Sequence, residues 1–403
     1  MRERPYRLLL TFTHPVQYTS PFLREMGTRS TFEITAAYCS LQGAEIGHDP
    51  GFGVDVAWDI PLLEGYPWVQ VRNASPRPGL THFFGLLNLE LWTMIRDGKY
   101  DAVLSYTGYA TAAFWIVAIA CKFYRVPLLF GTDATALKPR DGNHWKQLIK
   151  RYFLPAVFKL ANAIVIPSEA GRRFMISLGI ADDKVFLTPF AVDNDWWRRR
   201  AAEVDRDAIR KKWQVPDKSR VILFCAKLQI WKRPADVLRA FAKSGVLNAY
   251  LVFVGDGALR SDLEAEARAL NIDDKVRFLG FHNQTSLPGV YRSADLMVLP
   301  SEYDPCPVVV CESMLCGCPV AISDEIRGRF DLVEHGITGF IFPCGDTDAL
   351  ARIISDSLSR PTLLSDLGRA ASARMDSWTP SANVDGVARA VESVIRGKVR
   401  NDS

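Results

Sequence analysis

Long apolar runs are missing from this sequence. The most apolar stretch, residues 110–120, is bounded by Lys122 and Arg125 and is too short to span a bilayer. The opening segment, MRERPYR, lacks the features of a secretory signal peptide. The formal net charge is only +4, which argues against a dedicated nucleic-acid binder. We therefore expect a cytoplasmic protein with no nucleic acid among its partners.

Metal-ligand spacing is also missing. Zinc sites usually pair cysteines a few residues apart and add a distant second pair. Four of the eight cysteines cluster without that pattern: Cys306, Cys311, Cys316 and Cys318. We expect small buried thiols in a reducing compartment. Asp193 and Asp195 are interpreted as surface acids, so the prediction is no metal and no cofactor.

The dinucleotide-binding fingerprint is absent as well. Gly255-Asp256-Gly257 follows an apolar run, but the third glycine and the phosphate-cradling spacing of that fingerprint are missing. We interpret the three residues as a structural turn.

The sequence does contain a regular alternation of strand-like and helix-like segments. Hydrophobic residues make up 48% of the 403 residues and charged ones 23%, as in folded globular proteins large enough for two domains. Strands are predicted at residues 7–12, 32–38, 102–105, 126–130, 163–167, 185–188, 220–226, 250–254, 276–279, 296–299 and 339–342. Helices are predicted near residues 21–26, 110–123, 145–160, 234–244, 259–270 and 347–358. This alternation indicates α/β architecture with a doubly wound parallel sheet in each half.

The domain boundaries follow from an interruption of that pattern. A charge-rich stretch at residues 193–218 is interpreted as the linker. We therefore place an N-terminal domain at residues 1–195 and a C-terminal domain at residues 196–380.

The most informative segment, residues 299–323, reads as a strand, a loop, a helix and a second strand. Asp304 lies in the loop and Glu312 eight residues later in the helix, which begins near Val308. Free N–H groups at a helix start form an anion site. With two carboxylates beside it, such a site suits a phosphorylated ligand with hydroxyl groups, such as a nucleotide sugar. The alternative is an ordinary buried unit with two incidental acids.

This segment resembles the signature of retaining glycosyltransferases of family 4, which have the GT-B fold. The signature has Glu, seven residues, Glu, a helix of small residues, then Gly-x-Pro and a strand. Asp304 replaces the first Glu, Glu312 holds the second position, and Gly317 and Pro319 match the end. The resemblance implies two Rossmann-like domains facing a cleft, with the C-terminal helix at residues 382–396 packing back on the first domain.

The resemblance also implies the reaction and several roles. A sugar would pass from a nucleotide-diphosphate sugar to the hydroxyl of a glycan or lipid-linked acceptor. Asp304 would stabilise the sugar's oxocarbenium character, and Glu312 would hold the ribose hydroxyls. Lys227, in the place of the family's Arg, and Lys232 would neutralise the diphosphate. The remaining donor-binding residues would be Cys306, Val308, Val309, Gly280 and Phe281. Gly280 and Phe281 would contact the nucleotide base.

The first half matches the family more loosely. His14 and Gln17 lie in the first strand-to-helix loop and are candidates for the acceptor or the cleft. Alternatively, His14 has only a structural role, either as a helix cap or as a core residue whose ring nitrogens bind neighbouring groups of the protein. Asp133 stands where many members have a histidine that contacts the donor sugar, so the resemblance makes it a catalytic candidate beside Asp304, Lys227 and Lys232. A carboxylate can accept hydrogen bonds from sugar hydroxyls, but it cannot copy the N–H donor of a neutral imidazole.

Two other functions remain open from these residues. One is a nucleotide-sugar epimerase of the same fold, which needs no acceptor. The other is a catalytically weak binding or scaffold protein, suggested by the Glu-to-Asp change at Asp304. Fold resemblance alone does not separate them.

Residues 145–160 carry aromatic and basic side chains at helical spacing. Trp145, Ile149, Tyr152, Phe153 and Val157 form an apolar stripe, and the basic residues Lys146, Lys150 and Arg151 lie to its side. Such a helix can lie in a lipid headgroup layer at the inner face of the membrane. The alternative is that the stripe packs on the N-terminal sheet.

Overall fold

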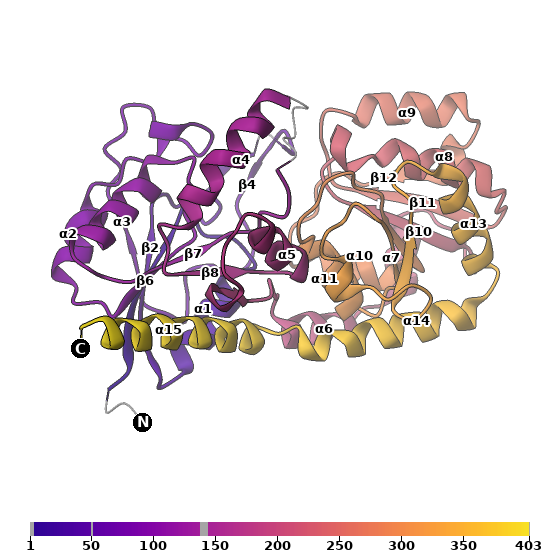
Figure 1. Ribbon diagram of the computed structural model, residues 1–403. Helices are drawn as coiled ribbons and strands as arrows, with labels where there is room; N and C mark the ends of the chain where they lie inside the picture. The colour runs from indigo at the N-terminus through magenta and orange to yellow at the C-terminus, as the bar shows by residue number, and fades with distance from the viewer. Residues whose placement is uncertain (1–3, 50, 138–143, 403) are drawn as a thin grey trace. The chain divides into compact units, whose positions relative to one another are not determined.

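The computed structural model describes residues 4–49, 51–137 and 144–402 (Figure 1). The chain forms two compact units. The first contains Met1–Ile46, Pro61–Ala191 and Pro380–Ser403, and the second contains Gly47–Ile60 and Val192–Thr379. Each unit is built on a parallel sheet with helices around it, which confirms the predicted pair of α/β domains.

The first unit has a seven-stranded sheet in the order β5-β2-β1-β6-β7-β8-β9, with every neighbouring pair parallel. Its strands are β1 (Tyr6–Phe12), β2 (Phe32–Tyr38), β5 (Trp68–Gln70), β6 (Ala102–Ser105), β7 (Leu128–Gly131), β8 (Ala163–Ile166) and β9 (Val185–Leu187). Its helices are α1 (Ser20–Thr28), α2 (Glu90–Asp97), α3 (Ala112–Phe123), α4 (His144–Phe158), α5 (Glu169–Ser177) and α15 (Pro380–Asp402), with short 3-10 turns at Phe83–Gly85 and Asp182–Lys184.

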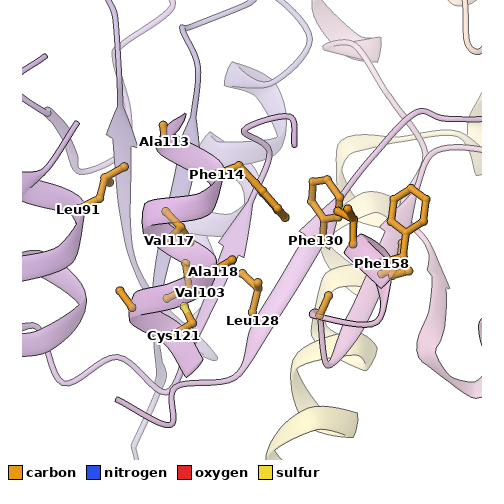
Figure 2. Packing of buried hydrophobic residues seen from close by; sticks show 14 of the residues in the cluster. Leu91, Val103, Ala113, Phe114, Val117, Ala118, Cys121, Leu128, Phe130 and Phe158 are labelled. Atoms are coloured by element: carbon orange, nitrogen blue, oxygen red, sulfur yellow. The ribbon is translucent and has the colours of Figure 1, made fainter. Parts of the chain in front are cut away.

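Successive side chains of each strand point to opposite faces of this sheet. Leu9 packs in the cluster formed with α2, α3, α4 and α5, whereas Leu8 and Leu10 pack in the cluster formed with α1 and α15. In the former cluster the ring centroids of Phe114 and Phe130 are 4.7 Å apart (Figure 2). The sheet is therefore buried on both faces, as parallel sheets usually are.

The last helix, α15, packs on α1, β8 and β9 of the first unit. Gly386 makes this approach possible, because a Cβ at that position would meet the carbonyl oxygen of Leu187 at 2.1 Å. Val387 and Val391 bury their side chains in the same cluster as Leu8.

The second unit has a six-stranded parallel sheet in the order β12-β11-β10-β13-β14-β15. Its strands are β10 (Arg220–Cys225), β11 (Ala249–Val254), β12 (Val276–Phe278), β13 (Leu296–Leu299), β14 (Val320–Ser323) and β15 (Gly339–Phe342). Its helices are α6 (Asn194–Ala202), α7 (Arg206–Lys212), α8 (Pro234–Ser244), α9 (Arg260–Ala269), α10 (Leu287–Ser293), α11 (Val308–Leu315), α12 (Arg329–Leu332), α13 (Thr347–Leu358) and α14 (Pro361–Arg374), with 3-10 turns at Ile230–Lys232, Asp273–Lys275 and Met375–Ser377. Helices α8, α9 and α13 share one apolar cluster with the sheet.

The stretch at residues 193–218, interpreted as a linker, is largely helical and belongs to the second unit. The Asp193 side chain accepts the Trp196 N–H at 3.0 Å and so caps α6, and Asp205 caps α7 in the same way. Trp197 is buried. The linker interpretation is therefore wrong, because charged residues on exposed helix faces hid the two helix starts.

A short antiparallel hairpin, β3 (Gly47–Asp49) and β4 (Val54–Val56), lies early in the sequence. It falls between two segments of the first unit, yet residues Gly47–Ile60 group with the second unit. We call this segment the 47–60 hairpin.

Candidate active site

The candidate site lies at the carboxyl ends of two neighbouring strands of the second unit. β10 and β13 are parallel neighbours, so the loops that follow them meet at one edge of the sheet. A backbone hydrogen bond of 2.8 Å from Glu302 N to Trp231 O ties these loops together. We call residues 226–233 and 300–307, with the first turn of α11, the edge site.

The loop that carries Lys227 is held by the glycine turn that follows β11. Leu228 N donates to Asp256 O at 2.9 Å, and a Cβ on Gly255 would meet Ala226 O at 2.1 Å. Gly255 also has a φ of +120°, which favours glycine. This turn is structural and positions Lys227 at the strand end.

Lys232 and Asp304 form an ion pair inside the edge site, so the structure brings two predicted catalytic residues together. Asp304 is only 8% exposed, and its backbone forms a bridge with Ile326. Arg233 is committed elsewhere, since its guanidinium contacts Asp236 at 2.6 Å. The Asp304 carboxylate is thus fixed in place by its backbone and by one cation.

The first turn of α11 offers backbone N–H groups to the edge site. Pro307 occupies the N-cap position and supplies no side-chain cap. Val308 and Val309 are both partly exposed at this helix start, while the Cys306 side chain just before it is buried. Uncapped N–H groups at a helix start attract anions.

Glu312 lies in the same helix but is only 1% exposed. The Tyr291 hydroxyl donates to its Oε2 at 2.8 Å. Burial raises the pKa of Glu312 to about 7, although hydrogen bonds from Tyr291 and Gln284 oppose the shift. The protonation of Glu312 therefore changes near neutral pH.

Gly280 and Phe281 follow β12 at the same edge of the sheet. Gly280 has a φ of +73°, and its carbonyl accepts Gly255 N–H at 2.8 Å. The Phe281 ring packs against Phe52 at 4.9 Å between centroids and against Trp58 at 6.3 Å. Both aromatic partners come from the 47–60 hairpin.

The 47–60 hairpin also reaches Lys227, a contact that our sequence reasoning missed. Lys227 Nζ donates to both carboxylate oxygens of Asp49, at 2.7 and 2.9 Å, and lies 4.5 Å from the centroid of the Phe52 ring. The glycine-rich run from Gly51 to Gly53 was the available signal for a turn, but nothing in the sequence indicated which part of the chain it contacts.

The remaining predicted residues belong to the first unit. His14 and Gln17 follow β1, and Asp133 follows β7 two strands away, so all lie at the carboxyl edge of that sheet. His14 Nδ1 lies 2.9 Å from Thr13 Oγ1.

The cysteines form no disulfide among the described residues, and seven of the eight are buried. No group of three potential His, Cys, Asp or Glu ligands occurs in the described part of the chain. Asp193 acts as a helix cap. Across the same described ranges, no helix combines the length and apolarity needed to cross a membrane.

Comparisons with known proteins define the class. Residues 205–374 match the family model Glycosyl transferases group 1, and residues 48–191 match Glycosyl transferase 4-like domain. The protein is therefore a glycosyltransferase with the GT-B fold.

Individual relatives agree with this class. The D-inositol 3-phosphate glycosyltransferase of Mycolicibacterium smegmatis is 25% identical over 402 residues, covering 93% of this chain and 89% of the relative. An uncharacterized glycosyltransferase of Methanocaldococcus jannaschii is 36% identical over 155 residues, 36% of this chain and 39% of that protein. The crystal structure of Anabaena HepE with UDP and glucose has a TM-score of 0.73 at 19% identity, covering 96% of this chain and 100% of HepE.

Proposed function

We propose that the protein transfers a sugar, with retention of configuration, from a nucleotide-diphosphate sugar to a hydroxyl acceptor. The observation that supports this proposal is the edge site, where two lysines, an uncapped helix start and the buried carboxylate of Asp304 share one end of a parallel sheet. Cations and N–H groups suit a diphosphate, and the carboxylate suits a sugar that develops positive charge.

The leaving diphosphate would be stabilised by the protein alone. Lys227, Lys232 and the N–H groups of Val308 and Val309 supply positive charge at the place where negative charge develops. A bound cation performs this task in other transferases. We therefore propose a reaction that needs no added metal.

The sugar and the nucleoside would be held by neighbouring groups. Asp304 would stabilise the oxocarbenium character of the donor sugar, as carboxylates do in glycoside chemistry. Glu312 would accept hydrogen bonds from the ribose, sharing its oxygens with Tyr291 and Gln284. Backbone groups of Gly280 and Phe281 would contact the base.

The first unit would supply the acceptor side. His14 and Gln17 are proposed to contact the acceptor. Asp133 is proposed as a catalytic residue that accepts hydrogen bonds from hydroxyls of the donor sugar. The Mycolicibacterium relative is named for D-inositol 3-phosphate, a hydroxyl-rich acceptor. We propose a glycan or lipid-linked acceptor met at the inner face of the membrane.

An exposed apolar face on α4 supports the membrane part of this proposal. Leu148, Ile149, Tyr152 and Phe153 are all exposed, with Tyr152 at 74%. Among the described stripe residues, Val157 is buried and the Phe153 ring contacts those of Tyr109 and Trp115, whereas Ile149 and Tyr152 are more than half exposed, so packing on the first unit accounts for only part of the stripe. Arg151 beside the stripe is exposed, whereas the side chains of Trp145 and Lys146 lie outside the described residues.

A donor screen by nucleotide release tests the proposed function. The intact protein is incubated in EDTA with UDP-, GDP- and ADP-sugars, with and without acceptor extracts, and products are identified by mass spectrometry. Acceptor-dependent release with glycosylated product is expected. Release of free sugar without an acceptor, or binding without release, would contradict the proposal.

A further inference from the structure

Both lysines of the edge site are already paired with carboxylates. Lys232 pairs with Asp304 and Lys227 pairs with Asp49. Arg233, next in the chain, pairs with Asp236. A diphosphate carries negative charge on both phosphates, so it meets lysines whose charge is neutralised. A phosphate oxygen that approaches either lysine ammonium therefore competes with the carboxylate already bound to it.

The two carboxylates differ in how firmly they are held. Asp304 is fixed by its backbone bridge to Ile326 and is nearly buried. The side chain of Asp49 is 28% exposed and lies at the end of a three-residue strand. Burial alone would raise the pKa of Asp49, but the hydrogen bond and charge of Lys227, together with the backbone N–H groups of Gly51 and Phe52, outweigh burial and lower it. Asp49 Oδ1 also accepts Gly51 N–H at 2.7 Å and Phe52 N–H at 3.1 Å. Both partners lie in the same hairpin, so the Asp49 carboxylate can leave Lys227 together with them.

The tip of the 47–60 hairpin encloses the Lys227 ammonium. Asp49 binds the ammonium directly and the Phe52 ring lies over it. Gly51 is so close that a Cβ there would lie 2.6 Å from Lys227 Nζ. The backbone of Gly51 thus lies directly beside the cation.

The base of the hairpin is anchored separately. Asn283 Nδ2 donates to Ala57 O at 2.7 Å, and Thr285 N donates to Asp59 Oδ1 at 3.0 Å. Trp58 packs beside Phe281. These contacts do not involve Asp49, so the Lys227–Asp49 pair can open while the base stays attached, which keeps Trp58 beside the edge site.

We propose that Asp49 is a positioning residue of the donor site, whose carboxylate holds Lys227 until the diphosphate of a nucleotide takes its place. This proposal rests on the proposed function. The ligand class is a nucleoside diphosphate or its sugar ester, and the exchange replaces one anion on Lys227 by another. No covalent bond changes.

A double-mutant cycle measured by calorimetry tests the exchange, with UDP, GDP and ADP as probes of the intact protein. Asp49→Asn removes the competing charge, so the nucleotide that binds wild type should bind about three- to tenfold tighter, as expected for a partly exposed ion pair. In a Lys227→Ala background, Asp49→Asn should not change the nucleotide affinity, because the ammonium for which Asp49 and the diphosphate compete is absent.

Asp55→Asn is the matched control. Asp55 lies on the same hairpin, is exposed and pairs with His48 at 3.2 Å, so the variant removes the same charge without touching Lys227. Its nucleotide affinity should equal that of wild type. The exchange would be contradicted if wild type and Asp49→Asn bound the nucleotide equally. It would also be contradicted if Asp55→Asn, or Asp49→Asn in the Lys227→Ala background, raised the affinity by the same factor. None of these results would contradict the proposed function. If no nucleoside diphosphate binds wild type or any variant, the proposed function fails and the exchange fails with it.

Discussion

Lys232 and Asp304 form an ion pair that joins the loop after β10 to the loop after β13, across 72 residues of sequence. The Asp304 side chain is 10% exposed and that of Lys232 is 19% exposed. Removing one member of a largely buried pair leaves the other charge without a partner, which costs about 3–5 kcal/mol in typical cases. The stability of any variant at Lys232 or Asp304 must therefore be measured together with its activity.

Asp304→Asn should lower turnover at least about a hundredfold while leaving donor affinity unchanged or slightly tighter. The proposed role of the carboxylate lies in the transition state, and its loss frees Lys232 for the diphosphate. Steady-state kinetics and nucleotide calorimetry measure the two effects separately. Asp304→Glu, the residue usual in the resembling family, is the control and should retain part of the activity. Wild-type turnover in Asp304→Asn would make the carboxylate structural.

Lys227→Ala should weaken binding of UDP more than binding of uridine, by up to about 1.5–3 kcal/mol for a charged hydrogen bond. Lys227→Arg should be tolerated, because arginine also binds phosphate. Lys243→Ala is a matched control, since Lys243 pairs with Asp348 on an exposed surface of the same unit. Equal affinity of the wild type for UDP and uridine would exclude a phosphate role for Lys227.

Except for the edge strand β5, which was missed, the strands of both sheets could be predicted to within about two residues. β10, predicted at residues 220–226, spans Arg220–Cys225, and β13 was placed at its observed bounds. Buried parallel strands are continuous apolar runs, which makes them easy to recognise. Lys232 and Asp304 could be assigned to one edge for the same reason, because each follows a recognised strand.

The contacts of the 47–60 hairpin could not be predicted in this way. Its strands have three residues each, and Asp49 meets Lys227 across 178 residues of sequence. Tyr291 was missed for a related reason, since a buried tyrosine in a helix gives no sign that its hydroxyl binds Glu312. Such pairings depend on tertiary packing rather than on local periodicity.

Glu312 should make the stability of the protein fall as pH rises from about 4.5 to about 7. The folded protein keeps a proton on Glu312 in this window while the unfolded chain releases it, so the free energy of unfolding drops by about 3 kcal/mol in total. Glu312→Gln stays neutral and should be free of this loss. Urea-unfolding midpoints at about pH 5 and about pH 8 measure the difference between variant and wild type. If the unfolding midpoints of Glu312→Gln and wild type changed with pH in the same way, the pKa of the Glu312 carboxyl would not be raised in the folded protein.

The exposed face of α4 leads to the last prediction. Ile149 and Tyr152 point away from the core, whereas Leu154 and Phe158 on the same helix are buried. The neighbouring helix α3 covers the same face of the sheet and exposes Ile119 and Phe123. Apolar side chains beside basic ones favour binding to an anionic lipid surface. We expect the protein to co-sediment with vesicles that contain phosphatidylglycerol, less so as salt rises.

Substitution of the exposed face should separate this binding from folding. The double variant Ile149→Ser with Tyr152→Ser removes two exposed apolar groups and should lower vesicle binding about tenfold or more, while the thermal midpoint stays near that of wild type. Leu247→Ser is the control, because Leu247 is 83% exposed on the second unit and its loss should leave binding unchanged. Wild-type protein that stays in the supernatant with anionic vesicles at low salt would refute the membrane contact.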